Sequence, residues 1–135
     1  MAKRRELLKF APALFLSGAA AAASIPSGIA DEAKAKLTKE AFGDLKIFFE
    51  GSTDQIKSMT AGSLRLKAGM EPHPPHTHPE EEFMVITEGT GELYIAGTTS
   101  KVGPGSMMYC AGNKVHGIKN TGKTSLLFYF YKWKA

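Results

Sequence analysis

Short apolar runs, each closed by turn-forming residues, narrow the possible folds of this chain more than any other feature. From residue 45 onward the runs are rich in β-branched and aromatic residues, and helical periodicity fades. Gly, Pro, Asn or Thr separate them, as at 89–91 and 103–105. The predicted strands are 45–50, 59–67, 82–88, 91–97, 105–110, 115–120 and 125–133. About seven or eight such strands predict an all-β sandwich or barrel.

The segment 31–44 precedes these strands and is predicted as a short N-terminal helix or linker. Within it, Ala33, Leu37 and Ala41 fall near one helical face, so residues 31–42 are expected either to pack outside the domain or to remain loose. With 43% apolar residues, the chain can bury one ordinary core. The barrel domain is predicted over residues 45–135.

The first thirty residues have the three-part layout of a bacterial export signal: basic residues, a weakly apolar run, then small residues. KRRELLK, at residues 3–9, resembles the twin-arginine export motif, although Lys3 and Leu7 replace its usual residues. Cleavage is expected after Ala23 or Ala30, which would make the protein periplasmic or otherwise exported. The alternative is an uncleaved anchor, because residues 10–30 are uncharged for 21 residues, although Pro and Gly interrupt them.

The formal charge of +4 does not indicate a nucleic-acid partner. Four of the 17 basic residues lie within the first nine positions, and residues 31–135 carry 13 basic against 12 acidic residues. A basic stripe for phosphates is therefore not evident, and membrane contact is expected only through the export signal. Cys110 is the only cysteine, so no intramolecular disulfide can form. It is expected to be a small buried hydrophobe, with a redox role as the alternative.

HPPHTHPEEE, at residues 73–82, concentrates candidate metal ligands. His76, His78 and Glu82 are an even number of positions apart, so their side chains can share one face of an extended chain. His116 lies on another predicted strand and would complete the set. Three imidazoles and one carboxylate suit a divalent transition metal and leave a coordination position open, as working sites require.

These residues fall into two motifs that resemble those of the cupin superfamily, in particular its small single-domain (type-2 conserved barrel) members. The first motif comprises Gly69, His76, His78, Glu82 and Gly89, and the second comprises Gly105, Gly112, His116 and Asn120. Ala111 and Asn113 stand where the family usually has Pro and Gly, and Asn tolerates the left-handed conformation. The resemblance implies a single jelly-roll β-barrel that holds a metal inside and is open at one mouth.

Several residues near the predicted site have more than one possible role. Glu81 is a second candidate for the carboxylate ligand, but its parity places it on the opposite face of the strand from Glu82. His73 is interpreted as exposed, or else as a mouth residue that contacts substrate. Met84 and Ile86 share the parity of Glu82 and should line the interior. Candidates for further pocket residues are Arg65, Lys67, Tyr94, Tyr109 and Tyr129, and the catalytic base cannot be named.

Two functional classes follow from the resemblance. One is a metal-dependent enzyme of the dioxygenase, isomerase or lyase type that acts on a small oxygen-bearing molecule. The other is a non-catalytic cupin that binds a metal, a sugar or another small ligand. Twin-arginine export moves folded proteins, so cytoplasmic metal loading favours iron(II) or manganese(II), with zinc or nickel as alternatives. The aromatic segment 128–133 is expected to be buried or to form the interface of a homodimer.

Overall fold

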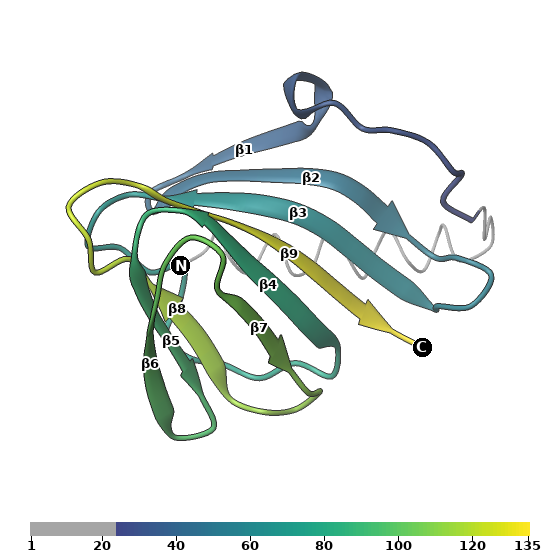
Figure 1. The fold of residues 1–135 in the computed structure, drawn as a ribbon. Helices are drawn as coiled ribbons and strands as arrows, with labels where there is room; N and C mark the ends of the chain where they lie inside the picture. The colour runs from purple at the N-terminus through teal and green to yellow at the C-terminus, as the bar shows by residue number, and fades with distance from the viewer. Residues whose placement is uncertain (1–23) are drawn as a thin grey trace.

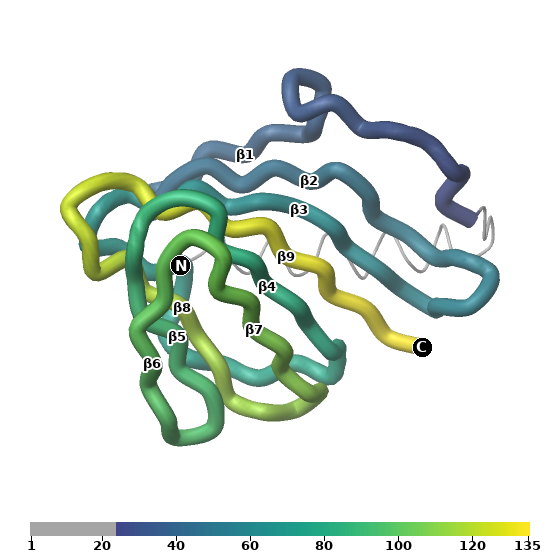
Figure 2. The backbone as a smooth tube through the Cα atoms, viewed as in Figure 1, coloured from purple at the N-terminus to yellow at the C-terminus, as the bar shows by residue number. Residues whose placement is uncertain are grey.

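The structure, a computed structural model, describes residues 24–135. The twin-arginine motif and most of the possible anchor lie outside the described residues. Figure 2 follows the chain from its first described residues, which lie beside the turn between the second and third strands. In the part described, no helix is long and apolar enough to cross a membrane.

Within residues 24–135, nine antiparallel strands form two sheets that enclose the core, and Figure 1 shows their arrangement. The six-stranded sheet has the order β1-β2-β3-β9-β4-β7, and the three-stranded sheet has the order β6-β5-β8. The strands are β1 Lys36–Glu40, β2 Gly43–Gly51, β3 Ser58–Leu66, β4 Glu81–Glu88, β5 Gly91–Ile95, β6 Thr98–Val102, β7 Met107–Cys110, β8 His116–Lys119 and β9 Leu126–Lys134. The predicted all-β fold is therefore confirmed, and the two facing sheets are those of a jelly-roll barrel.

The prediction of a helix over residues 31–42 is wrong. A single 3-10 turn, η1 Glu32–Lys34, is followed by β1, which pairs with β2 along its whole length. Leu37 remains 46% exposed, so the segment has no apolar surface against which to stabilise a helix. An isolated helix of this length is marginal, whereas the edge of β2 offers a complete ladder of hydrogen bonds.

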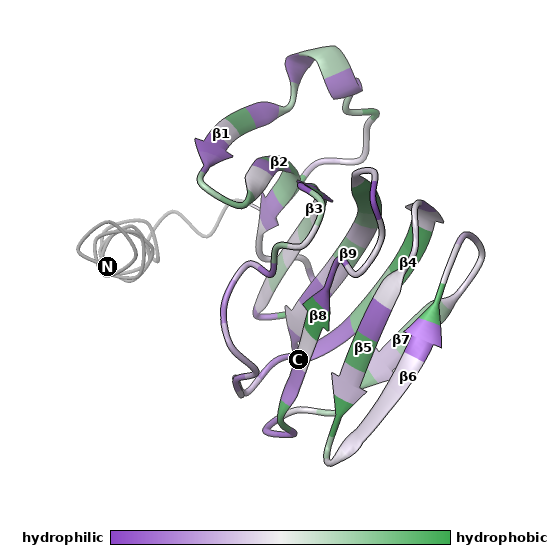
Figure 3. Ribbon diagram, turned by 90° about the vertical axis from the view of Figure 1, so that its left-hand side faces the viewer, coloured by the Kyte–Doolittle hydropathy of each residue, from purple (hydrophilic) through white to green (hydrophobic). Residues whose placement is uncertain are grey.

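Strand β6 was not predicted from the sequence. Its residues, TTSKV, are mostly exposed and mostly pale in the hydropathy colours of Figure 3. It forms because the Ala96-Gly97 turn folds it back onto β5, with Leu93 opposite Ser100. Ala96 and Gly97 both have positive φ, as two-residue hairpin turns require.

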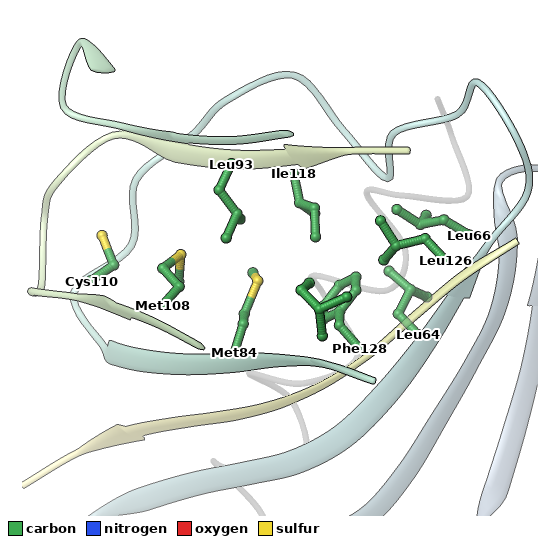
Figure 4. Packing of buried hydrophobic residues seen from close by; sticks show 10 residues of the cluster. Leu64, Leu66, Met84, Leu93, Met108, Cys110, Ile118, Leu126 and Phe128 are labelled. Carbon is green, nitrogen blue, oxygen red and sulfur yellow. The ribbon is translucent and has the colours of Figure 1, made fainter. Parts of the chain in front are cut away.

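The core lies between the two sheets. Figure 4 shows Leu93 and Ile118 of the smaller sheet facing Met84, Met108 and Phe128 of the larger one. Ile86 is almost fully buried as well. The prediction that Met84 and Ile86 face the interior is confirmed, and β4 therefore directs Glu82 inward by the same alternation.

Candidate metal centre

Backbone hydrogen bonds bring the two predicted histidine motifs together. His76, in the loop before β4, forms an isolated antiparallel bridge with His116 at the start of β8. The N–H of each residue donates to the carbonyl of the other at 3.0 Å. This bridge fixes the two side chains near each other independently of any contact between the rings.

The turn before β8 is tied to the same loop. The N–H of Asn113 donates to the carbonyl of His78 at 2.8 Å. Asn113 has a φ of 63°, which confirms that it occupies a left-handed turn position. A Cβ at Gly112 would come within 2.4 Å of the Pro79 carbonyl oxygen, so the close approach of the two loops requires glycine there.

The ring nitrogens of His76, His78 and His116 converge. One nitrogen from each ring lies within 4.8 Å of the other two. The ring centroids are 4.7 to 5.2 Å apart, and the rings meet edge to face. Three histidines this close could bind a divalent metal after a small inward movement, because zinc–nitrogen bonds are about 2.0 to 2.1 Å long.

Glu82 completes the cluster from β4 and is only 5% exposed. Its Oε1 lies 3.0 Å from Nε2 of His78 and 3.2 Å from Nε2 of His116. The structure thus brings all four predicted ligands into one region, with Glu82 in direct contact with two of the three histidines. Glu81 points to the opposite face, where it accepts a hydrogen bond from Tyr109 at 2.7 Å.

The donor set of this cluster fits a cation. Nδ1 of His78 lies 3.1 Å from the Glu80 carbonyl oxygen, and Nδ1 of His116 lies 3.0 Å from that of Lys114. A carbonyl oxygen only accepts, so each Nδ1 carries a proton and each Nε2 is left to offer a lone pair. Two lone pairs directed at one carboxylate oxygen repel it unless a proton or a metal ion lies between them. Histidine ligands oriented by backbone carbonyls are a common feature of metal sites.

Opposing effects set the acidities of the cluster. Burial raises the pKa of Glu82, but hydrogen bonds from His116 and His78 outweigh it and bring the pKa to about 2. Burial, followed by the neighbouring histidine charges, lowers the pKa of His76 to about 4. The hydrogen bond to Glu82 raises the pKa of His116, while the charge of Lys132 acts in the opposite direction. A neutral His76 and an ionised Glu82 are the forms that bind a metal.

A cavity of about 380 Å³ opens beside the cluster and is lined by all four of its residues. This volume lies within the range of ordinary small-molecule sites. The remaining wall is mostly apolar, with contributions from Phe42, Leu45, Ile47, Leu64, Met84, Ile118, Phe128 and Phe130. Glu50, Thr60 and Lys132 are the further charged or hydroxyl side chains among the lining residues of the described chain.

None of the polar residues proposed from sequence as further pocket candidates lines this cavity. Arg65 forms an ion pair with Glu88 at 3.0 Å, and Tyr129 packs on Phe48. Lys132 was missed, although one signal was available: it has the inward parity of Phe128 and Phe130 in the aromatic segment. Parity within a strand could not be related to the cavity before the strand order was known.

His73 and Cys110 have different environments. His73 lines the cavity, and its ring centroid is 3.7 Å from that of His76, so it belongs to the mouth of the site. Cys110 is 1% exposed and belongs to the core cluster, which confirms the expectation of a small buried hydrophobe. Burial raises the pKa of its thiol, which disfavours the reactive thiolate.

Comparisons with known proteins agree with this fold and cluster. The profile of the family described as Cupin domain matches residues 62–131, which is more than half of the chain and spans all four clustered residues. Among curated proteins, none matches this chain by sequence.

Several solved structures are similar. An RmlC-like cupin from Shewanella frigidimarina has a TM-score of 0.69 and 13% identity, covering 84% of this chain and 96% of that chain. A predicted oxalate decarboxylase from Thermotoga maritima has a TM-score of 0.65 and 17% identity, covering 80% of this chain and 100% of that chain. The polyketide cyclase RemF from Streptomyces resistomycificus has a TM-score of 0.63 and 16% identity, covering 80% of each chain. Identities this low establish the shared fold alone.

Proposed function

This chain belongs to the cupin domain family, and we propose that it is an exported cupin that binds one divalent transition metal. The ligands are His76, His78, Glu82 and His116. The observation that carries the proposal is the approach of two histidine Nε2 atoms to Glu82 Oε1, while backbone carbonyls hold the opposite ring nitrogens. That arrangement directs lone pairs and negative charge to one point.

The metal site is further proposed to be catalytic. A bound metal ion would polarise an oxygen of the substrate, activate a water molecule or, if redox-active, bind dioxygen. The adjoining cavity admits a small molecule, and its apolar wall would exclude water around it. We therefore favour an enzyme of the dioxygenase, isomerase or lyase type that acts on a small oxygen-bearing compound. The second candidate is a non-catalytic cupin that binds a metal, a sugar or another small ligand.

Turnover separates the two candidates. Small oxygen-bearing compounds are offered to the metal-loaded protein, and any product formed is compared with that of His116→Ala, after far-ultraviolet circular dichroism has shown that the variant folds. His78→Ala provides a second ligand variant, because His78 is less buried than His116. Lys134→Ala is the control, because Lys134 is exposed and does not line the cavity. Turnover that is lost in both ligand variants and kept in the control supports an enzyme. Equal turnover in all four proteins refutes catalysis at this site.

The proposed metal is iron(II) or manganese(II), with zinc or nickel as alternatives. The affinity of a histidine and carboxylate site rises toward copper, so folding in the cytoplasm would let metal availability favour the weaker binders. Glu82 supplies a hard oxygen ligand, which suits either favoured ion. Stoichiometric copper in protein from its own cell envelope, without activity after exchange to iron or manganese, would contradict cytoplasmic loading.

Export by the twin-arginine route is proposed with a mature chain that begins at Ser24. Ser24 bridges Ser52, its hydroxyl bonds Asp54 at 3.1 Å, and the N–H of Ile25 donates to the Ser52 carbonyl at 2.8 Å. Cleavage after Ala30 would remove these contacts. Intact-mass analysis of envelope protein measures the start, and replacing Arg4-Arg5 by Lys-Lys should block export. Retention of residues 1–23 would support the anchor instead.

We also propose a homodimer formed by the outer face of the six-stranded sheet. Phe83, Met107, Tyr109 and Tyr131 are exposed there, and Phe83 packs on Tyr109 with their ring centroids 5.2 Å apart. Exposed apolar patches of this kind mark interaction surfaces. Light scattering after gel filtration should give a dimer that Phe83→Lys dissociates. Ile29→Lys, which lies outside both sheets and is 95% exposed, is the control and should leave the dimer intact, whereas a monomeric wild-type protein would contradict the proposal.

A further inference from the structure

One row of inward-facing side chains crosses five strands of the larger sheet. The strand registers place Glu50 opposite Thr60, Thr60 opposite Lys132, Lys132 opposite Glu82, and Glu82 opposite Cys110. Side chains directly opposite one another on one face of a sheet are neighbours, with Cβ atoms about 4.5 to 5.5 Å apart. Lys132 is therefore the cationic neighbour of the metal-site carboxylate.

The position of Lys132 is unusual for a lysine in this protein. It lines the cavity and is only partly exposed, although it follows Phe128 and Phe130 on the inward side of an aromatic strand. Within residues 24–135, no ion pair joins its ammonium group to a carboxylate within 4.0 Å, and the neighbouring Glu82 is paired with His78 and His116 instead. Because no pair with Glu82 forms, the charge of Lys132 is not neutralised across the strands, and the residue lines the cavity.

We propose that Lys132 determines ligand specificity by binding the carboxylate of a small organic acid. This inference rests on the proposed metal centre and names the class of its ligand. The ligand is a monocarboxylate with an apolar body and a hydroxyl or oxo oxygen on the adjacent carbon. Its carboxylate binds the Lys132 ammonium, and the adjacent oxygen reaches toward the proposed metal centre, whose carboxylate Glu82 is one strand away.

The rest of the lining agrees with this ligand class. The Thr60 hydroxyl lies next to Lys132 in the row and can donate a second hydrogen bond to the carboxylate. Phe42, Leu45 and Ile47 offer an apolar wall for the body of the molecule. Glu50 lies at the exposed end of the row and would repel a second carboxylate, which favours monocarboxylates. A divalent ion together with Lys132 outweighs the single charge of Glu82, so the inner site attracts anions.

The plain alternative is that Lys132 only covers apolar surface with its methylene stem and keeps its ammonium in water. In that case its charge contributes nothing to ligand choice. The two readings differ in how the protein distinguishes an anion from a neutral molecule of the same shape, and a matched probe pair tests this difference.

The probes are mandelate, a 2-hydroxy acid with an apolar ring, and mandelamide, its neutral amide. Calorimetric titration measures their affinities for the purified protein, and metal content is determined on the same samples. The variants are Lys132→Met, which keeps the length of the stem, Lys132→Arg, which keeps the charge, and Lys134→Met. Lys134 is the matched control because it lies on the same strand, is exposed and does not line the cavity.

The wild-type protein and Lys134→Met should bind mandelate about tenfold or more tighter than mandelamide, since a charge-assisted hydrogen bond contributes this much. Lys132→Met should lose the preference, and Lys132→Arg should keep part of it, with metal content equal in all four proteins. A wild-type protein that binds the probes equally, or binds neither, overturns the inference, as does a preference that survives in Lys132→Met. If the purified protein holds its full metal content but does not prefer mandelate over mandelamide, only this inference is refuted. If the protein as purified holds no divalent metal but shows a preference for mandelate that depends on Lys132, only the proposed metal centre is refuted.

Discussion

Replacing Glu82 by Gln removes the one negative charge that His78 and His116 share. The folded protein lowers the pKa of Glu82 from 4.5 to about 2, a shift of about 2.5 units. At 1.36 kcal/mol per unit, the folded state favours the ionised carboxylate by about 3 kcal/mol relative to the unfolded chain. Gln has the shape of the protonated form, so metal-free Glu82→Gln should unfold about 3 kcal/mol more easily where the carboxylate is ionised and His116 is protonated.

The sign of each shift gives the pH window of this effect. The Glu82 pKa is lowered, so its contribution is present above about pH 4.5 and is lost as the pH falls toward about 2. The His116 pKa is raised, so its contribution is present below about pH 6.5 and is lost as the pH rises through the folded pKa. The difference between wild type and Glu82→Gln should therefore be largest between about pH 5 and pH 6.5, and should decline on both sides.

Urea unfolding with a chelator present, repeated across this pH range, measures the difference. Glu81→Gln is the matched control, because the neighbouring carboxylate lies on the outer face and bonds only the exposed Tyr109 among the described side chains. It should change stability by less than about 1 kcal/mol at every pH. A Glu82→Gln variant as stable as wild type near pH 6, or a difference that does not vary with pH, would refute the proposed electrostatic arrangement.

Three further predictions follow from single contacts. Asn120→Ala should lower the free energy of unfolding by about 2 to 4 kcal/mol, because its fully buried amide bonds two carbonyls and one N–H, and chemical denaturation measures this. Asn113→Val should cost about 1 to 3 kcal/mol at its φ of 63°, while Asn113→Gly should cost almost nothing; equal losses would contradict the turn argument. Metal affinity measured by chelator competition should fall as the pH falls from about 7 to about 5, because the raised pKa of His116 lets protons compete with the metal for its ring nitrogen. An affinity that does not change with pH would exclude His116 as a ligand.

The fold was predictable where local pattern and burial agree. The strands from β2 to β5 and from β7 to β9 were found because their apolar residues alternate or cluster between turn residues. β6 was not predicted because its sequence, TTSKV, has no alternation of apolar and polar residues. It forms because the hairpin turn after β5 places it beside that strand, with which it pairs. The segment that contains β1 was predicted as a helix or linker because Ala33, Leu37 and Ala41 fit both periodicities. The segment forms a strand because it pairs with the free edge of β2. No local sequence pattern indicates that this edge is available.

The candidate site was predictable as a set of residue types, but its surroundings were not. Parity within a single strand was enough to separate Glu82 from Glu81, and two spaced motifs related His116 to His76. The cavity lining depends on the order of strands in the sheet, which places Lys132 of β9 between Thr60 of β3 and Glu82 of β4. Residues far apart in sequence become neighbours only through that order, so no pattern within one strand could identify them.

Elemental analysis of the protein purified from its own cell envelope, without added metal, tests the central claim most directly. We expect one iron or manganese ion per chain in the wild-type protein and in the mouth variant His73→Gln, and less than about a tenth of that in His78→Gln and Glu82→Gln, since loss of a ligand removes most of the affinity. Wild-type protein that contains no divalent transition metal, or ligand variants that retain it in full, would contradict the assignment of His76, His78, Glu82 and His116 as a metal centre.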